Sequence, residues 1–124
     1  MGDAPEIVLV EHKLDRAELA RLVHLFFDDM VTYVVDIERG IAAVGGGLHA
    51  DAETLLLESG SRQSDLWGAN YYPGKGRDAC IEFTSLINIR PGQGNRGMLI
   101  ADPEIRERVR EITFALIGEG EPLE

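Results

Sequence analysis

The chain has 124 residues, and its 22 acidic residues against 12 Lys plus Arg give a formal net charge of -10. This length suits a single domain with a real core, while the charge disfavours non-specific binding to nucleic acids or anionic membranes. Cys80 is the only cysteine, which excludes an intrachain disulfide and a multi-cysteine metal site. Without a basic secretory leader or an apolar run of membrane-spanning length, we expect a cytoplasmic protein.

The spacing of apolar residues predicts alternating short strands and helices along the whole chain. In chain order, the expected elements are a strand over 7–10, a helix over 16–30, strands over 31–38 and 41–44, a helix over 52–58, strands over 66–72 and 79–90, and a helix over 103–117.

The first and last helices have the clearest start sequences. Asp15 followed by Glu18 is typical of a capping pair, and it precedes apolar residues at helical spacing. Asp-Pro-Glu at 102–104 supplies a cap, a proline suited to the first helical position and an acid at the positive end of the helix dipole. We expect both helices to bury their apolar stripes, with Phe26 and Val109 in the core.

The strands are organised as hairpins. β-Branched residues alternate over 31–38, Arg39-Gly40 is typical of a hairpin turn, and the Gly-rich segment 73–76 joins the two later strands. Hairpins without regular βα alternation predict a single two-layer α+β domain, with a mixed, mostly antiparallel sheet of about five strands and three helices on one face. A three-layer parallel arrangement is the alternative. Residues 1–4 and 118–124 are expected to be loose.

The segment 92–97 matches G-x-G-x-x-G, the fingerprint of dinucleotide-binding folds. That motif requires the glycines to open a helix directly and an acid about 20 residues later. Here residues 98–101 intervene before the helix that begins near Pro103, and the chain then nearly ends. A dinucleotide site is therefore not expected.

The same loop is notable for its charge, since residues 83–101 contain no Asp or Glu in an otherwise acidic chain. Glycines and forked guanidinium donors are suited to holding a phosphate or carboxylate. The candidate anion or ligand site comprises Asn70, Asn88, Arg90, Gln93, Asn95 and Arg96. The alternative is a surface loop whose arginines pair with the protein's own acids, for instance Arg90 with Glu82.

An acidic group forms the second candidate site. Asp36 and Glu38 share a strand parity, and His49 and Asp51 follow the glycine triplet at 45–47. Oxygen ligands with one imidazole suit a divalent metal ion such as Mg²⁺, Mn²⁺ or Zn²⁺. The alternative is that these acids face water or charge the start of the helix over 52–58.

Several short motifs resemble those of a family of short prokaryotic proteins known only as a domain of unknown function. They include Val34-Val35-Asp36-Ile37-Glu38, Leu48-His49-Ala50-Asp51-Ala52-Glu53, Leu66-Trp67-Gly68 and Ile89-Arg90-Pro91. The resemblance covers most of the chain and implies a stand-alone cytosolic domain. It implies no activity, cofactor or catalytic residue.

These observations favour a small non-catalytic domain that binds a small ligand, a metal or a protein partner. The alternative is a metal-assisted phosphate or ester hydrolase, with the acidic group and His49 holding the metal while Arg90 and Arg96 hold the substrate anion. A third hypothesis is an interaction protein that forms a homodimer through an exposed strand edge.

Overall fold

A computed structural model describes residues 4–123 of the chain. None of its helices, within that range, has the length and apolar character needed to cross a membrane. The regular elements are β1 (Ile7–Val10), α1 (Arg16–Phe26), β2 (Val31–Asp36), β3 (Ile41–Gly45), α2 (His49–Glu58), β4 (Leu66–Tyr71), β5 (Ile81–Glu82) and α3 (Pro103–Leu116).

The strands form one five-stranded sheet in the order β1-β3-β2-β4-β5, and every neighbouring pair is antiparallel. The predicted α+β class, with three helices and an antiparallel sheet, is confirmed. The short strands β1 and β5 form the two edges, and homodimerisation through an edge stays a prediction.

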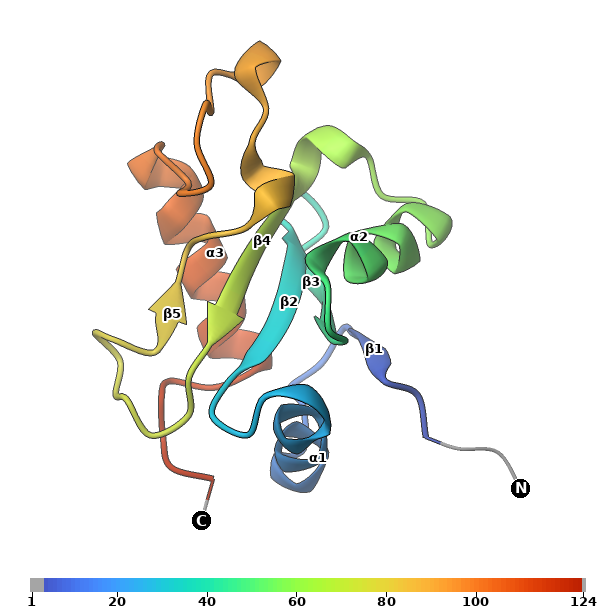
Figure 1. Cartoon of the computed structure of the whole chain (residues 1–124), viewed down its shortest axis with the longest axis vertical. Coiled ribbons are helices and arrows are strands. Elements are labelled where there is room, and N and C mark those ends of the chain that lie inside the picture. The colour runs from blue at the N-terminus through green and yellow to red at the C-terminus, as the bar shows by residue number, and fades with distance from the viewer. Residues whose placement is uncertain (1–3, 124) are drawn as a thin grey trace.

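The helices cover both faces of the sheet instead of the single face that we expected. α1 and α3 pack on the face that carries Tyr33 and Val35, whereas α2 packs on the face that carries Val34. Figure 1 shows α2 in front of the strands and α3 behind them. All six residues of β2 are buried, and a strand buried on both faces needs cover on both sides.

Helix α1 ends at Phe26, four residues before the predicted boundary. Asp28 takes a left-handed conformation with φ 72°, and its N–H donates to the Val23 carbonyl at 3.0 Å, which closes the helix. Phe26 is 44% exposed, so its predicted burial is wrong: it lies in the last turn, beside the glycine turn at Gly47. Val109 is fully buried in α3, as predicted.

Of the starts of α2 and α3, one agrees with its prediction and one does not. Asp102 caps α3 as predicted, with its Oδ1 accepting the Glu104 N–H at 2.8 Å. α2 begins at His49 rather than Ala52, and Leu48 occupies the cap position without a side-chain cap bond. Asp51 therefore lies inside the first turn and is not a cap.

The long strand predicted over 79–90 is reduced to the two residues of β5. Beyond it the chain forms short 3₁₀ turns at Leu86–Asn88 and Pro91–Gln93, with isolated bridges from Thr84 to Leu99 and from Arg90 to Asn95. Apolar residues do alternate along this segment, but hydrogen bonds from buried asparagine side chains take the place of the expected backbone hydrogen bonds between strands.

The C-terminal tail, which was expected to be loose, is held against the end of β4. The Gly120 N–H donates to the Tyr71 hydroxyl at 2.8 Å, and the Gly74 N–H donates to the Gly120 carbonyl at 3.0 Å. Gly118 and Gly120 are buried, and a Cβ on Gly118 would lie 2.4 Å from the Tyr71 hydroxyl. Residues 1–3 and Glu124, which belong to the ends expected to be loose, lie outside the described residues.

Candidate functional site

A cavity of about 580 Å³ lies on the α2 face of the sheet, beside the N-terminus of α2. Its floor is the part of β2 and β4 that α2 leaves uncovered. The lining residues come from five parts of the chain: Phe27, Met30 and Thr32; residues 47–50; Asn70; Glu82 with residues 84–87; and Met98. Segments far apart in the sequence therefore meet around one hollow.

The polar part of the floor is a cross-strand pair. Asn70 on β4 lies directly opposite Glu82 on β5, which places both side chains on the same face. The Asn70 Nδ2 donates to Glu82 Oε1 at 2.8 Å, and the Tyr72 hydroxyl donates to the same oxygen at 3.0 Å. These bonds hold the carboxylate and the amide in one orientation. Burial, followed by Glu82, raises the pKa of Tyr72, which keeps its hydroxyl a donor.

The other atom of the Asn70 amide is buried. Asn70 is only 9% exposed, and its Oδ1 lies beside the His49 ring without a hydrogen bond of ordinary length. Leaving a buried acceptor unpaired costs about 1–3 kcal/mol, so nearly all such atoms find a donor. Because Oδ1 has almost no accessible surface, a ligand in the cavity would meet other atoms of the Asn70–Glu82 pair.

His49, the first residue of α2, stands at the cavity wall. Its Nε2 donates to the Ala69 carbonyl at 2.8 Å, and the ring lies so close to β4 that a Cβ on Gly68 would be 3.1 Å from His49 Cδ2. Burial lowers the pKa of the imidazole, while the Ala69 carbonyl, the Asn70 side chain and Glu82 oppose that effect. The ring is thus neutral at pH 7, with Nε2–H committed to the backbone.

The rim of the cavity is apolar and exposed. Leu48 is 65% exposed and Leu86 is 71% exposed, and both line the cavity; Phe27 and Met98, which also line it, are partly exposed. Large apolar side chains gathered at one exposed place are typical of binding sites. The site thus combines an apolar entrance with a polar floor.

Most residues of the predicted anion site already form hydrogen bonds within the protein. The fully buried Asn88 side chain bonds both the N–H and the C=O of Gly68, at 2.9 and 3.0 Å. Asn95, also buried, donates to the Asn88 carbonyl at 2.8 Å and accepts the Ala101 N–H at 2.8 Å. Both asparagines hold the 84–101 segment in place.

Arg90 is a structural residue in the same segment. Its guanidinium donates to the carbonyls of Gln63, Leu66 and Ile87 and to the Gln93 side chain, and it lies over the Trp67 ring at 4.3 Å. The predicted pairing of Arg90 with Glu82 is wrong, because Glu82 accepts from Asn70 and Tyr72. Gln93 also donates to the Ser64 carbonyl, and Arg96 is exposed. Anion binding here stays a prediction, and it would require Arg90 to give up backbone bonds.

The four predicted metal ligands do not meet. Asp36 is fully buried at the end of β2, where its Oδ1 accepts the N–H groups of Glu38 and Arg39 at 2.9 Å each and so closes the hairpin turn. Glu38 and Asp51 are exposed, and His49 faces β4. Over residues 4–123 no three His, Cys, Asp or Glu side chains are grouped to hold a metal ion. The hydrolase hypothesis therefore has no assembled metal centre in this part of the chain.

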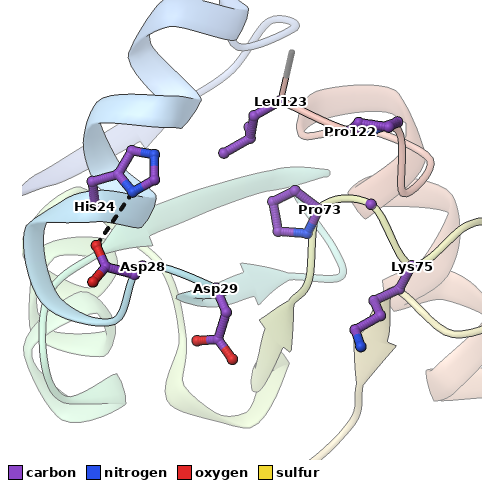
Figure 2. Close-up of a pocket in the computed structure, with 8 residues that line it drawn as sticks. His24, Asp28, Asp29, Pro73, Lys75, Pro122 and Leu123 are labelled. Atoms are coloured by element: carbon purple, nitrogen blue, oxygen red, sulfur yellow. Dashed lines mark hydrogen bonds and ion pairs between the residues drawn. The ribbon is translucent and has the colours of Figure 1, made fainter.

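A second hollow of about 370 Å³ lies between the end of α1 and the C-terminal tail (Figure 2). His24 Nδ1 on α1 lies 3.3 Å from Oδ1 of Asp28, which follows the end of that helix, and Asp29 and Lys75 line the same hollow. The His24 and Asp28 side chains are 57% and 85% exposed, so water already solvates them.

Of the residues that line the cavity beside α2, sequence reasoning identified Asn70 and His49 but assigned them to two different sites. Glu82 and the apolar rim were missed. The asparagine within the apolar strand 66–71 could have indicated the site, because burying a polar side chain costs free energy unless the side chain is hydrogen-bonded.

Comparison with protein families supplies one finding. The model of a family described as a protein of unknown function (DUF5674) matches residues 8–116. Comparisons with curated proteins and with solved structures found no match.

Proposed function

The chain belongs to the DUF5674 family of unknown function, and we propose that it is a non-catalytic binding domain for a small organic ligand. The ligand occupies the cavity beside the N-terminus of α2, with an apolar body at the rim and a polar end on the floor.

The observation that carries this proposal is the cavity itself, where exposed apolar side chains such as Leu48 and Leu86 lie beside the polar Asn70–Glu82 pair. The neighbouring Glu82 holds the amide in place before any ligand arrives, so little ordering is needed on binding.

The size and lining of the cavity support the same function. Its volume of about 580 Å³ falls in the range of roughly 300–1,000 Å³ that small-molecule sites occupy. Such sites are mostly apolar with a few convergent polar groups, as here, where Leu48, Leu86 and Met98 surround the Asn70–Glu82 pair.

Filling the cavity tests the proposal. Ala50 is exposed, lines the cavity and is the second residue of α2, so Ala50→Trp would occupy the space without disturbing the core. Ala17→Trp is the matched control, because Ala17 is the exposed second residue of α1 and lies outside the cavity.

The measurement is an amide NMR titration with benzyl alcohol, a neutral probe with an apolar body and one hydroxyl donor. We expect shifts at residues 47–50, at Asn70 and at residues 84–87 in the wild type and in Ala17→Trp, and their loss in Ala50→Trp. Shifts scattered over the surface, or unchanged by Ala50→Trp, would contradict the proposal.

A further inference from the structure

We infer that a second copy of this chain docks on the rim of the cavity beside α2 and covers its entrance. The inference does not depend on the proposed ligand, because it rests on the exposed apolar side chains of the rim and on the charges beside them. It places the contact between copies away from the two edge strands of the sheet.

Six large apolar side chains form an exposed patch around the entrance. Four of them line the cavity, and the other two adjoin these four: Leu99 follows Met98, and the ring centroids of Phe26 and Phe27 are 6.3 Å apart. We call this set the rim patch, and its members, which are 39–71% exposed, are Phe26, Phe27, Leu48, Leu86, Met98 and Leu99. Covering such side chains with a partner's surface is favourable, because apolar surface is removed from water.

The area of the rim patch fits one side of a protein–protein interface. With roughly 150 Å² for a fully exposed large side chain, the rim patch presents roughly 500 Å² of apolar surface. A standard interface buries about 800 Å² on each partner and is about 60% apolar, so its apolar share is also roughly 500 Å². A ligand inside the cavity would leave Phe26 and Leu99 uncovered, because they lie outside its lining, whereas a second copy would cover them.

Hydrogen bonds hold the half of the rim patch that lies on the segment 84–101. Leu86, Met98 and Leu99 belong to this segment. The Asn88 Nδ2 donates to the Met98 carbonyl at 3.1 Å, and the Asn95 Nδ2 donates to the Leu99 carbonyl at 3.1 Å. These apolar side chains are therefore presented by a backbone that is already fixed, and little ordering is needed when a partner docks.

The charges beside the rim patch differ between its two halves. The half at the end of α1 and the start of α2 is acidic, because the exposed Asp28, Asp29 and Asp51 lie next to it in the chain. The half on the segment 84–101 has no acid, and Arg96 is exposed there. A two-fold axis between the halves brings each half against the opposite half of the other copy. Arg96 of each copy then faces the aspartates of the other, so the rim patch is complementary to itself.

A net charge of -10 on each copy opposes self-association, which favours a contact through the part of the surface with fewest acids. The segment 83–101 contains none. The edge strand β1 is less suitable. Pairing it antiparallel with its own copy, centred between Val8 and Leu9, sets Glu6 of one copy opposite Glu11 of the other, and like charges directly opposite each other are destabilising.

Sedimentation velocity of the full chain over a concentration series tests the inference. We expect the mass to rise from 13.6 kDa toward twice that value. Leu86→Asp should weaken the dimer at least about tenfold, because it buries a charge in the interface. The matched control is Leu57→Asp, the same change at an exposed apolar position of α2 outside the rim patch, which should leave the dimer unchanged.

A second pair of variants tests the charges. Arg96→Glu should weaken the dimer about fivefold or more, because two contacts in each dimer change from attraction to repulsion. Arg62→Glu makes the same charge reversal at an exposed position outside the cavity, and it should weaken the dimer less. A thermal melt of each variant checks that the fold is retained.

An amide NMR dilution series shows where the copies meet. We expect concentration-dependent shifts at residues 26–27, 47–48, 86–87 and 98–99, and none along β1. A monomer at every concentration, shifts along β1 in place of the rim patch, equal effects of the two leucine variants, or equal effects of the two arginine variants would refute the inference. The proposed ligand is judged separately, by whether Ala50→Trp abolishes the benzyl alcohol shifts.

Discussion

The most demanding prediction concerns Asn88, because its side chain forms the hydrogen bonds that a neighbouring strand would otherwise form. In an antiparallel sheet, a residue facing a neighbouring strand exchanges an N–H and a C=O bond with it. Gly68 makes that exchange with a side-chain amide: Asn88 Oδ1 accepts its N–H at 2.9 Å and Nδ2 donates to its carbonyl at 3.0 Å. Nδ2 also donates to the Met98 carbonyl at 3.1 Å.

Asn88→Ala removes these three bonds and leaves the main-chain groups of Gly68 without partners. At about 0.5–1.5 kcal/mol net for each bond, with a further penalty of about 1–3 kcal/mol for a buried group that stays unpaired, we expect a loss of about 3–5 kcal/mol. Domains of this size are stable by about 5–15 kcal/mol, so a protein of average stability stays folded and measurable.

The assay is urea unfolding followed by the fluorescence of Trp67, combined with hydrogen exchange at the Gly68 amide. The control is Gln63→Ala, which also deletes an amide but at an exposed position where that amide bonds no described residue, and should change the unfolding free energy by no more than about 0.5 kcal/mol. If Asn88→Ala costs less than about 1 kcal/mol and leaves the Gly68 amide protected, the side-chain bonds do not hold this edge of the sheet, and the reasoning is wrong.

Three further results are expected. Phe26→Ala should lower the free energy of unfolding by about 1 kcal/mol, because Phe26 is half-exposed, whereas Val109→Ala should lower it by about 1.5–3 kcal/mol, because Val109 is fully buried. Urea unfolding measures both values, and equal losses would contradict the packing. Asp36→Ala should lose about 1–3 kcal/mol through its two turn bonds, and Asp36→Asn, which keeps the Oδ1 acceptor, should lose less. Because burial lowers the pKa of His49 in the folded state, the unfolded chain binds its proton first, so stability should fall as the pH drops below about 6.5. His49→Gln should flatten that part of a pH-stability profile, and an unchanged slope would exclude His49 as its source.

The elements that were predicted well from the sequence depend on interactions between residues close together in the chain. The cap, proline and acid at 102–104 act within one turn of helix, so the start of α3 could be predicted and is observed. The turn at Arg39-Gly40 joins two strands with strong β propensity, and these form the hairpin of β2 and β3. The family resemblance, carried by short local motifs, is confirmed by the match over residues 8–116.

Contacts between distant segments decided the rest. The segment 79–90 alternates like a strand, but a strand needs a partner ladder, and the buried side chain of Asn88 takes its place. Phe26 follows the helical period of α1, yet its helix runs out before a neighbour covers it. Periodicity states which side of an element is apolar and cannot state what lies opposite.

The site shows the same division. The amino-acid sequence alone determined that the chain is acidic and that it holds a polar asparagine in an apolar strand. Only the tertiary structure decided which polar atoms remain available, because that depends on partners far away in the chain. Arg90 donates to the carbonyls of Gln63 and Leu66, whereas Asn70 donates to Glu82 on the neighbouring strand. Whether a polar group is hydrogen-bonded depends on its neighbours in the folded chain, whereas the sequence shows only which groups can form such bonds.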